Sequence, residues 1–320
     1  MSYELIVGRK TPGDLLNLTN SVTTASWITQ RTGNPGKLTF TYLRTPQSKI
    51  EEGDVVRFSA DGELQFYGWV FSRGQDRWGP VDVVCYDRLR YLKANNSYTF
   101  YAQSAADIIK QICEDLQVDV GTLDDTGYKL PSLQDKSCID IINTAIQKTL
   151  LNTGTVFVFY DSGDGVALRS AADMKSDYII GEKSLMTNYS YNTSIDSQTY
   201  NSIKLVRPNK ETGKSDVFIR KDSDTIARWG LLQLYQKVDE AATDAQVKEQ
   251  AKVSLEYYNR VLQQLKFTSL GVNSLRAGQL LLVNINDLDG DPFRKYVMLE
   301  KVSHTWENDL HTMELEAKAL

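Results

Sequence analysis

The chain carries two kinds of hydrophobic periodicity. From residue 3 to about residue 94, apolar and polar residues alternate one by one, as they do in Lys37–Leu43 (KLTFTYL). A period of two is typical of a β-strand with one buried face. Asp61-Gly62, which lies between two such segments, is a strong hairpin signal. Strands at regular spacing with glycine-containing turns predict a small antiparallel β-barrel.

The period becomes helical after Tyr98. Two segments place apolar residues three and four positions apart, which predicts two amphipathic helices, the first capped by Ser104. Their apolar residues are Ile108, Ile109, Ile112 and Leu116 in the first and Ile139, Ile142 and Ile146 in the second. A strand, a turn at Gly163-Asp164-Gly165 and a returning strand follow. We therefore expect a small α+β domain in this region.

A longer helix is expected between Thr243 and Leu265. Thr243 and Gln246 have the spacing of a capping box, in which each side chain bonds to the other residue's backbone N–H. Apolar residues then recur at steps of three and four, at Val247, Ala251, Leu255, Tyr258, Leu262 and Leu265. A single apolar stripe predicts a helix that lies on a β domain or on a neighbouring subunit.

The last part of the chain repeats the pattern of the first part. Leu38–Leu43 matches Leu265–Leu270, Gly53 matches Gly278, and a hairpin follows in both copies. The two matched glycines are 225 positions apart, and the two matched strands begin 227 positions apart. Two short β patterns can agree by chance, but here the elements also come in the same order. We therefore predict two related β-barrels with the α+β domain inserted between them.

These patterns predict a division of the chain into four parts. Residues 1–97 form a first barrel, and 98–185 form the inserted α+β domain. Residues 186–230 and 265–320 form the second barrel, while 231–264 supply a linker and the amphipathic helix. The expected fold class is mainly β: two related antiparallel β-barrels, a small inserted α/β domain and one long helix.

Length, charge and cysteine content narrow the function classes. A chain of 320 residues predicts two or three domains, and a net charge of −5 without a basic stripe disfavours nucleic-acid binding. No run of 18 apolar residues is present, and the first residues do not resemble a signal peptide, so membrane insertion and secretion are not expected. Cys85, Cys113 and Cys138 lack CxxC spacing, which favours buried thiols in a reducing compartment.

His304 and His311 are the only two histidines, and they lie seven positions apart. We expect Glu307-Asn308-Asp309 to form a hairpin turn between them, which would bring the two rings within about 5–8 Å. A zinc site needs three or four ligands, and only Glu307 or Asp309 could add to this pair. His304 and His311 are therefore weak metal candidates, and the expectation is that they are structural.

Other candidate chemistry is weak. An EF-hand loop in NDLDGDPF would need an acidic residue five positions before Gly290, where Ile285 stands. Asp124-Asp125 could be paired catalytic carboxylates, but adjacent side chains on a glycine-flanked loop diverge, so a solvated turn is favoured. The Gly163-Asp164-Gly165 turn has no helix after it to form a phosphate site. We expect no catalytic residues, no cofactor and no enzymatic activity.

Three motifs carry a resemblance to a known family. They are A-R-W-G-L-L-Q at Ala227–Gln233, G-Q-L-L-L-V at Gly278–Val283, and H-x6-H-T-M-x-L at His304–Leu315. In this order, with two barrels around an insertion, the chain resembles the baseplate hub proteins of contractile phage tails. The resemblance is to the late-control-D-like group, particularly the hubs of prophage-derived tails in Gram-positive bacteria.

The resemblance implies a homotrimer in which each chain contributes two tail-tube-like barrels to a pseudo-six-fold ring. Such a ring joins the tail tube to the central spike, and contacts other baseplate proteins and possibly the tape-measure protein. It also implies a place in a virion or tail-like particle assembled in the bacterial cytoplasm. Residues assigned to assembly or structure on this basis are Gly53, Gly278, Trp229, Tyr258, His304 and His311.

Two alternative functions belong to other classes. One is a tail-associated peptidoglycan hydrolase or cell-wall-binding protein, with the 98–185 insertion as its active module. The other is a secreted carbohydrate-binding β protein, against which the missing signal peptide and the free cysteines both speak.

Overall fold

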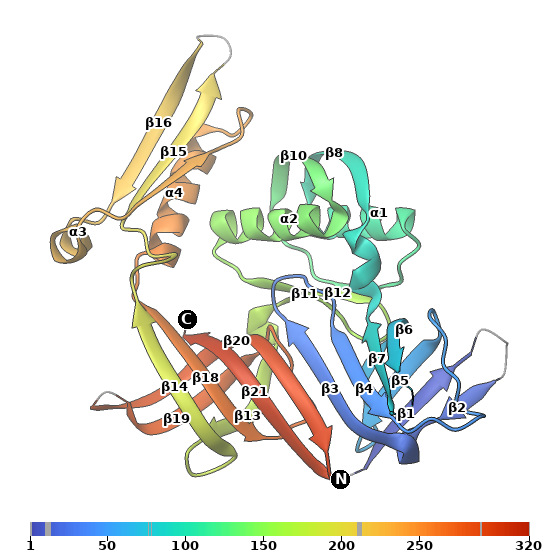
Figure 1. The fold of residues 1–320 in the computed structure, drawn as a ribbon. Coiled ribbons are helices and arrows are strands. Elements are labelled where there is room, and N and C mark those ends of the chain that lie inside the picture. Colours follow the sequence, from blue (N-terminus) through green and yellow to red (C-terminus); the bar gives the residue numbers. More distant parts are fainter. Residues whose placement is uncertain are drawn as a thin grey trace.

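The computed structural model describes residues 2–9, 14–75, 77, 79–209, 213–288 and 290–319. Two β-barrels stand side by side at the base of the molecule, a helical insertion lies above the first barrel, and a small lobe projects above the second (Figure 1). No helix in these residues is both long and apolar enough to span a bilayer.

Six strands of the first barrel correspond to the six strands of the second, and β2 is additional in the first. The first barrel contains β1 (Tyr3–Gly8), β2 (Leu15–Asn17), β3 (Val22–Gln30), β4 (Lys37–Tyr42), β5 (Val55–Ala60), β6 (Glu63–Gln75) and β7 (Val81–Tyr86), with the 3-10 turn η1 (Thr19–Ser21). The second contains β13 (Lys175–Gly181), β14 (Met186–Ser194), β18 (Leu262–Leu270), β19 (Leu280–Leu288), β20 (Asp291–Glu307) and β21 (Leu310–Ala319).

The order of the strands is also the same. It is β3-β4-β7-β6-β5-β1 in the first barrel and β14-β18-β21-β20-β19-β13 in the second. The copies differ at the last strand, because β1 is antiparallel to β5 whereas β13 is parallel to β19. This equivalence confirms the predicted fold class of two related β-barrels with an α+β insertion.

The matched glycines occupy the same place in the two copies. The Gly53 N–H donates to the Val70 carbonyl at 2.8 Å, and the Gly278 N–H donates to the Leu299 carbonyl at 2.7 Å. Their φ angles of 87° and 93° lie in the left-handed region, which favours glycine. One residue after Val70 in β6, and one after Leu299 in β20, the register shifts at a β-bulge.

Alternation along each strand produces the cores. In β4, Leu38, Phe40 and Tyr42 point inward and are almost fully buried. Each such side chain contributes about 1.5–3 kcal/mol through the area it removes from water. Leu265 and Phe267 occupy the corresponding positions of β18 and are also buried.

The insertion has a core of its own. Its elements are β8 (Asn95–Ser104), α1 (Ala105–Asp115), β9 (Val120–Leu123), β10 (Lys129–Ser137), α2 (Cys138–Thr153), β11 (Phe157–Asp161), β12 (Val166–Ser170) and η3 (Ala171–Asp173), preceded by η2 (Arg88–Lys93). Ser104 caps α1 as predicted, in a capping box with Asp107. The apolar stripes of α1 and α2 face each other in one cluster with Phe157 and Phe159.

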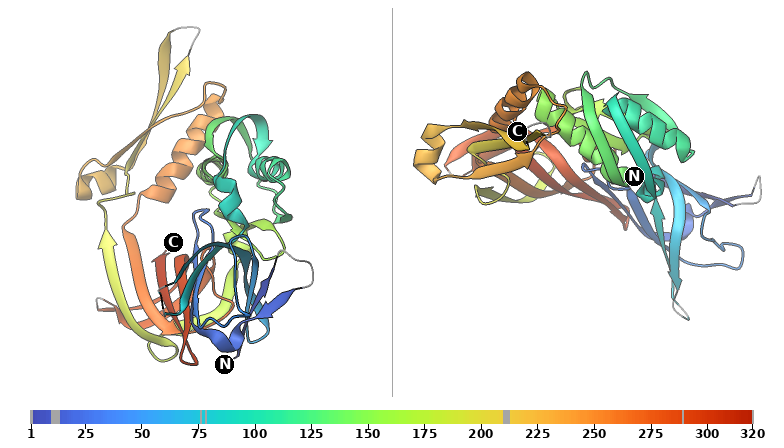
Figure 2. Two further views of the ribbon diagram at one scale, coloured as in Figure 1. Left: turned by 45° about the vertical axis from the view of Figure 1, so that its right-hand side comes forward. Right: turned by 90° about the horizontal axis from the view of Figure 1, so that it is seen from above.

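The projecting lobe differs from the sequence prediction, which placed residues 186–230 in the second barrel. Only β14 lies there, while β15 (Ser202–Asn209), β16 (Lys214–Lys221) and β17 (Gln233–Lys237) form a separate sheet with α3 (Ser223–Trp229). Helix α4 (Asp244–Tyr258) covers one face of this sheet. In the left view of Figure 2 the sheet of the lobe projects above the barrels. Strand β14 leads from the second barrel into the lobe, and β18 leads back into the barrel.

Two predicted boundaries are also wrong. The long helix ends at Tyr258, so Leu262 and Leu265 belong to β18 and not to the helical stripe. Strand β18 is hydrogen-bonded on both edges, to β14 and β21, and this pairing outweighs a helical period that continues by coincidence. Strand β13, expected in the insertion, instead pairs with β19 of the second barrel.

Candidate functional site at the junction of the barrels

Strand β20 joins the two barrels into one sheet. Its first half pairs with β19, and beyond the bulge its second half, Lys301–Glu307, pairs with residues 30–24 of β3 in antiparallel register. The sheet therefore continues from one barrel into the other without a break. This β3–β20 joint fixes the two barrels at one relative orientation, because strand hydrogen bonds are directional.

Aromatic rings reinforce the joint. Trp27 of β3 stacks on His304 of β20 with ring centroids 5.1 Å apart, and Trp306 stacks on His311 at 4.4 Å. Trp306 also meets Phe58 edge-on at 4.8 Å, inside the core of the first barrel. The last hairpin of the second barrel thus completes the core of the first.

The two histidines form a buried hydrogen-bonded pair. His304 Nε2 lies 2.7 Å from the Leu275 carbonyl oxygen, which can only accept, so Nε2 carries the proton. His304 Nδ1 then accepts from His311 Nε2 at 2.9 Å. Burial lowers the pKa of His304 to about 3, and the nearby His311 ring lowers it further. Burial also lowers the pKa of His311 to about 4, although the charge of Asp61 acts in the opposite direction.

The hairpin has the predicted turn. Asn308 and Asp309 connect β20 to β21 with φ angles of 51° and 60°, as a two-residue turn requires. The described residues contain no group of three or more His, Cys, Asp and Glu side chains placed to hold a metal ion. Since the two rings bond to each other, the geometry supplies neither the number of ligands nor the free nitrogen pairs of a zinc site.

The free energy of unfolding should fall as the pH is lowered, because the buried pair of histidines resists protonation in the folded chain. In the unfolded chain both histidines bind protons below about pH 6.5, whereas the native pair stays neutral until near pH 4, so the contribution is full above pH 6.5 and is lost as pH falls. Between about pH 7 and pH 4.5 we expect the wild type to lose on the order of 3–5 kcal/mol more unfolding free energy than His304→Gln/His311→Gln. Urea titrations at a series of pH values measure the unfolding free energy of both proteins. The same change of that free energy with pH in the two proteins would contradict the prediction.

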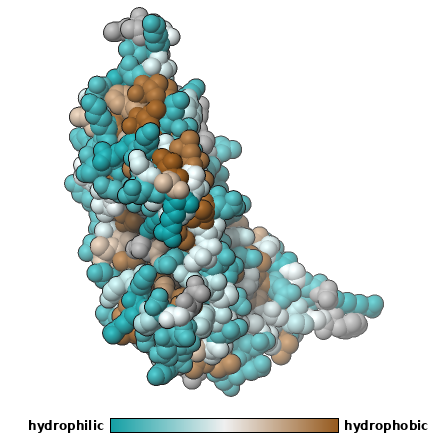
Figure 3. Space-filling view, turned by 90° about the vertical axis from the view of Figure 1, so that its left-hand side faces the viewer, coloured by the Kyte–Doolittle hydropathy of each residue, from teal (hydrophilic) through white to brown (hydrophobic). Residues whose placement is uncertain are grey.

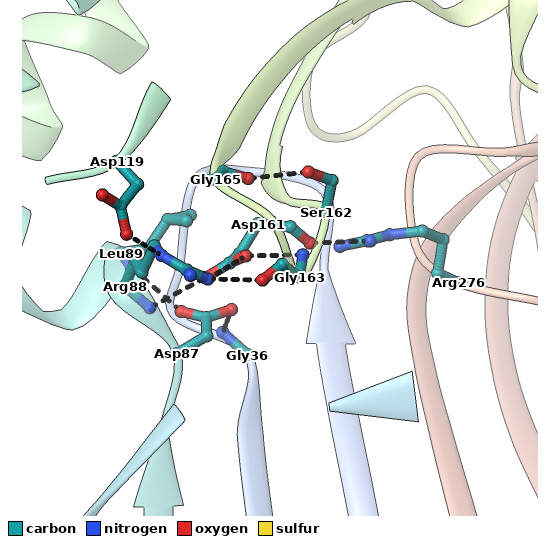
Figure 4. Close-up of polar contacts among 10 residues, drawn as sticks. All are labelled: Gly36, Asp87, Arg88, Leu89, Asp119, Asp161, Ser162, Gly163, Gly165 and Arg276. Carbon is teal, nitrogen blue, oxygen red and sulfur yellow. Dashed lines mark hydrogen bonds and ion pairs between the residues drawn. The ribbon is translucent and has the colours of Figure 1, made fainter. Parts of the chain in front are cut away.

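A polar network links the insertion to the first barrel (Figure 4). Arg88, which follows β7, donates from Nη1 to Asp161 Oδ1 at 3.1 Å and to the Gly163 carbonyl at 2.9 Å. Its backbone N–H donates to the other oxygen of Asp161 at 3.0 Å, and its Nε donates to Asp119 at 3.2 Å. Both Arg88 and Asp161 are buried, so each charge depends on the other for compensation.

The same network reaches the second barrel. Arg276, in the loop before Gly278, donates from Nη1 to the Asp161 carbonyl at 2.9 Å and lies 4.0 Å from the centre of the Tyr160 ring. Asp87 caps η2 through the Leu89 N–H and accepts from the Gly36 N–H at 2.7 Å. Burial, and secondarily the charge of Asp161, raises the pKa of Asp87. Side chains from three parts of the chain thus meet around Asp161.

Sequence reasoning missed Arg88, Asp161 and Arg276. It identified Gly163-Asp164-Gly165 only as a turn, and the turn is present, but the Gly163 carbonyl also accepts from Arg88. Since the partners are more than 70 positions apart, no local spacing could have joined them.

The other predicted residues lie apart from one another. A Cβ on Gly278 would come 2.3 Å from Val158 Cγ1, so this glycine also allows the insertion to approach the second barrel. Trp229 ends α3 in the lobe, where buried Asn201 bonds to the Gly230 carbonyl and the Leu232 N–H. Tyr258, at the end of α4, contacts Tyr200 and is hydrogen-bonded to Gln147 of α2. The six residues therefore do not form one site.

The weaker candidates have structural partners. Asp124 accepts from Arg169 Nε at 3.2 Å and from the Ser170 N–H at 2.9 Å, while Asp125 bonds to the Gly127 N–H. Asp287 accepts from the Gly290 N–H at 3.0 Å, and Asp289 lies outside the described residues.

In the described part of the chain, two strand segments are hydrogen-bonded on one edge only, although the equivalent segments of the other barrel are hydrogen-bonded on both. Strand β14 corresponds to β3 but pairs only with β18, and residues 72–75 of β6 correspond to the second half of β20 but pair only with β7. Within the described part of the chain, these edges are the counterparts of the two strands that make the β3–β20 joint.

The sequence is similar to one family of known proteins. A family profile described as YQBQ-like matches residues 25–318. The protein YqbQ of Bacillus subtilis (strain 168) is 30% identical over 83% of this chain and 81% of its own length. The phage-like element PBSX protein XkdQ of the same organism is 27% identical, over 83% of this chain and 82% of its own.

Solved structures share the fold at low identity. The tail protein of Neisseria meningitidis MC58 superposes with a TM-score of 0.70 at 11% identity, over 99% of this chain and 97% of that one. Since the identity is low, this similarity establishes the arrangement of elements alone.

Proposed function

The chain belongs to the YqbQ-like family, and from this premise we propose that it is a structural hub protein in the baseplate of a contractile phage tail or tail-like particle. Membership is consistent with such a role because the relative XkdQ is a protein of the phage-like element PBSX. The fold, shared with a protein named as a tail protein, supports the same role.

The observation that carries the proposal is the joint between two equivalent barrels. If β14 of one copy pairs with residues 72–75 of β6 in the next copy, as β3 pairs with β20 within the chain, every barrel meets its neighbours in the same way. Three chains then close a ring of six similar barrels. Closure also covers both open strand edges, which would otherwise invite uncontrolled association.

A ring of this kind adapts symmetry. Six similar barrels match a six-fold tail tube on one side, while three identical chains match a three-fold spike on the other. The partners in this proposal are the chain itself, the tube protein, the central spike and other baseplate proteins, possibly with the tape-measure protein. Its place is the assembled particle, put together in the bacterial cytoplasm.

In this proposal the projecting lobe contacts those other proteins. The face of its sheet that α4 leaves open carries Val217, Ile219 and Tyr235, each more than half exposed. Figure 3 shows apolar side chains on the surface of this lobe. Exposed apolar residues gathered on one face are typical of protein interfaces.

The role is proposed to be non-enzymatic. The insertion was the candidate module for a hydrolase, and two of its acidic residues, Asp124 and Asp161, are engaged by arginines. Neither is free to act as a general acid or base in the present geometry.

Mass in solution tests the proposal. Light scattering of the purified chain, alone and with its spike protein, should give a species of three chains of 36.2 kDa each, about 109 kDa. A chain that remains monomeric at high concentration and with the spike would contradict the ring. The isolated insertion would then be tested for cell-wall-degrading activity.

A further inference from the structure

The insertion, the lobe and both barrels meet around one cavity of about 340 Å³. Helix α2, the end of α4, strand β11, the middle of β20 and the end of β21 form its walls. The apolar part of the lining includes Ile146, Leu150, Phe157, Phe159, Leu262 and Met298. A volume of this size lies at the lower end of the range of small-ligand sites, roughly 300–1,000 Å³.

The charged part of the lining is unbalanced. Arg31 pairs with Glu300, with Nε 3.0 Å from Oε1, so that carboxylate is already neutralised. Arg260 and Lys318 face the same cavity, and no ion pair to either is found among the described residues. Two of the basic side chains that border the cavity therefore have no ion-pair partner in the part of the chain that the structure describes.

The side chain of Arg260 packs against an aromatic ring. Its guanidinium carbon lies 5.0 Å from the centre of the Tyr257 ring, and Tyr257 packs edge-on against Tyr258 at 4.9 Å. The Nε of Arg260 is buried and has no hydrogen-bond partner. An unpaired buried donor is rare in a folded protein, because it gives up a hydrogen bond that water would supply.

We propose that this cavity binds an apolar carboxylate, such as the C-terminal residue of a partner polypeptide. The carboxylate would accept from Arg260 and Lys318, and the hydrocarbon part would lie against Phe157, Leu262 and Met298. Since the walls come from every part of the chain, an occupant would also hold those parts together. The inference concerns a single chain and does not depend on the ring.

The test uses N-acetyl-phenylalanine as the probe and N-acetyl-phenylalaninamide as its uncharged counterpart, titrated into the full chain and followed by NMR. We expect the acid to bind with a dissociation constant in the millimolar range or below and the amide at least about tenfold more weakly, since charge-assisted hydrogen bonds are the stronger class. Equal affinity of the two, or no binding of the acid, would overturn the proposal.

Matched variants locate the site. Arg260→Gln and Lys318→Gln should each weaken binding of the acid about tenfold, while Lys266→Gln, which removes a surface lysine paired with Glu316, should leave it unchanged. If Arg260→Gln destabilises the chain, Lys318→Gln alone decides the outcome. Unchanged binding in Lys318→Gln would overturn the assignment to this cavity.

The source of the carboxylate is distinguished by a third probe, a hexapeptide ending in the same phenylalanine with a free carboxylate. Binding as tight as that of the single residue indicates that the cavity receives the end of a polypeptide. Binding of the single residue without the peptide indicates a small-molecule carboxylate instead.

Discussion

Oxidation of the Ser72→Cys/Ser194→Cys variant is expected to link three chains into a covalent ring. Within the chain, Gln30 of β3 lies opposite Lys301 of β20. The equivalent of Gln30 is Ser194, because Trp27 pairs with Leu38 as Tyr191 pairs with Leu265. The equivalent of Lys301 is Ser72, since each follows the bulge in its own strand.

The chemistry suits this pair of positions. Directly opposite residues of antiparallel strands have Cα atoms about 4.5–5.5 Å apart, within the range that a disulfide spans. The native Cys85, Cys113 and Cys138 are free and buried, so they should not compete. A denaturing gel without reductant should show a band of three chains as the largest product.

The control for register is Ser72→Cys/Thr193→Cys. Adjacent residues of a strand point to opposite faces, so this pair should cross-link poorly. A ladder that extends beyond three chains would indicate an open filament and not a closed ring. Equal cross-linking of both variants, or none in either, would contradict the proposed pairing.

Arg88→Met should destabilise the chain by about 3–5 kcal/mol, because it leaves the buried carboxylate of Asp161 without its counter-charge. Since Arg88 and Asp161 join the first barrel to the insertion, the variant should also assemble less well. Urea unfolding followed by tryptophan fluorescence measures the first effect, and light scattering measures the second.

Two further variants make this prediction specific. Arg57→Met removes an exposed arginine of β5 and should change stability by less than about 0.5 kcal/mol. Arg88→Met/Asp161→Leu removes both buried charges and should recover part of the loss, because no uncompensated carboxylate then remains. If Arg88→Met were no more harmful than Arg57→Met, the network would not be holding the junction.

Local patterns predicted most of the elements. The turn at Asn308-Asp309, the caps at Ser104 and Thr243, and the equivalence of Gly53 and Gly278 all follow from residues close in sequence or from a repeat that can be aligned. The same reasoning extended the long helix through Leu262 and Leu265, where two strand partners decide the conformation.

The sequence by itself determined that this chain is a duplicated β protein with an insertion, because alternation, caps and turns are short-range properties. Only the tertiary structure decided how the parts are joined: that β20 serves both barrels, that His304 bonds to His311, and that Arg88 meets Asp161. These contacts connect residues up to 283 positions apart, as between Thr24 and Glu307. They arise because a strand edge and a buried charge must find partners somewhere in the folded chain, and no local pattern specifies where.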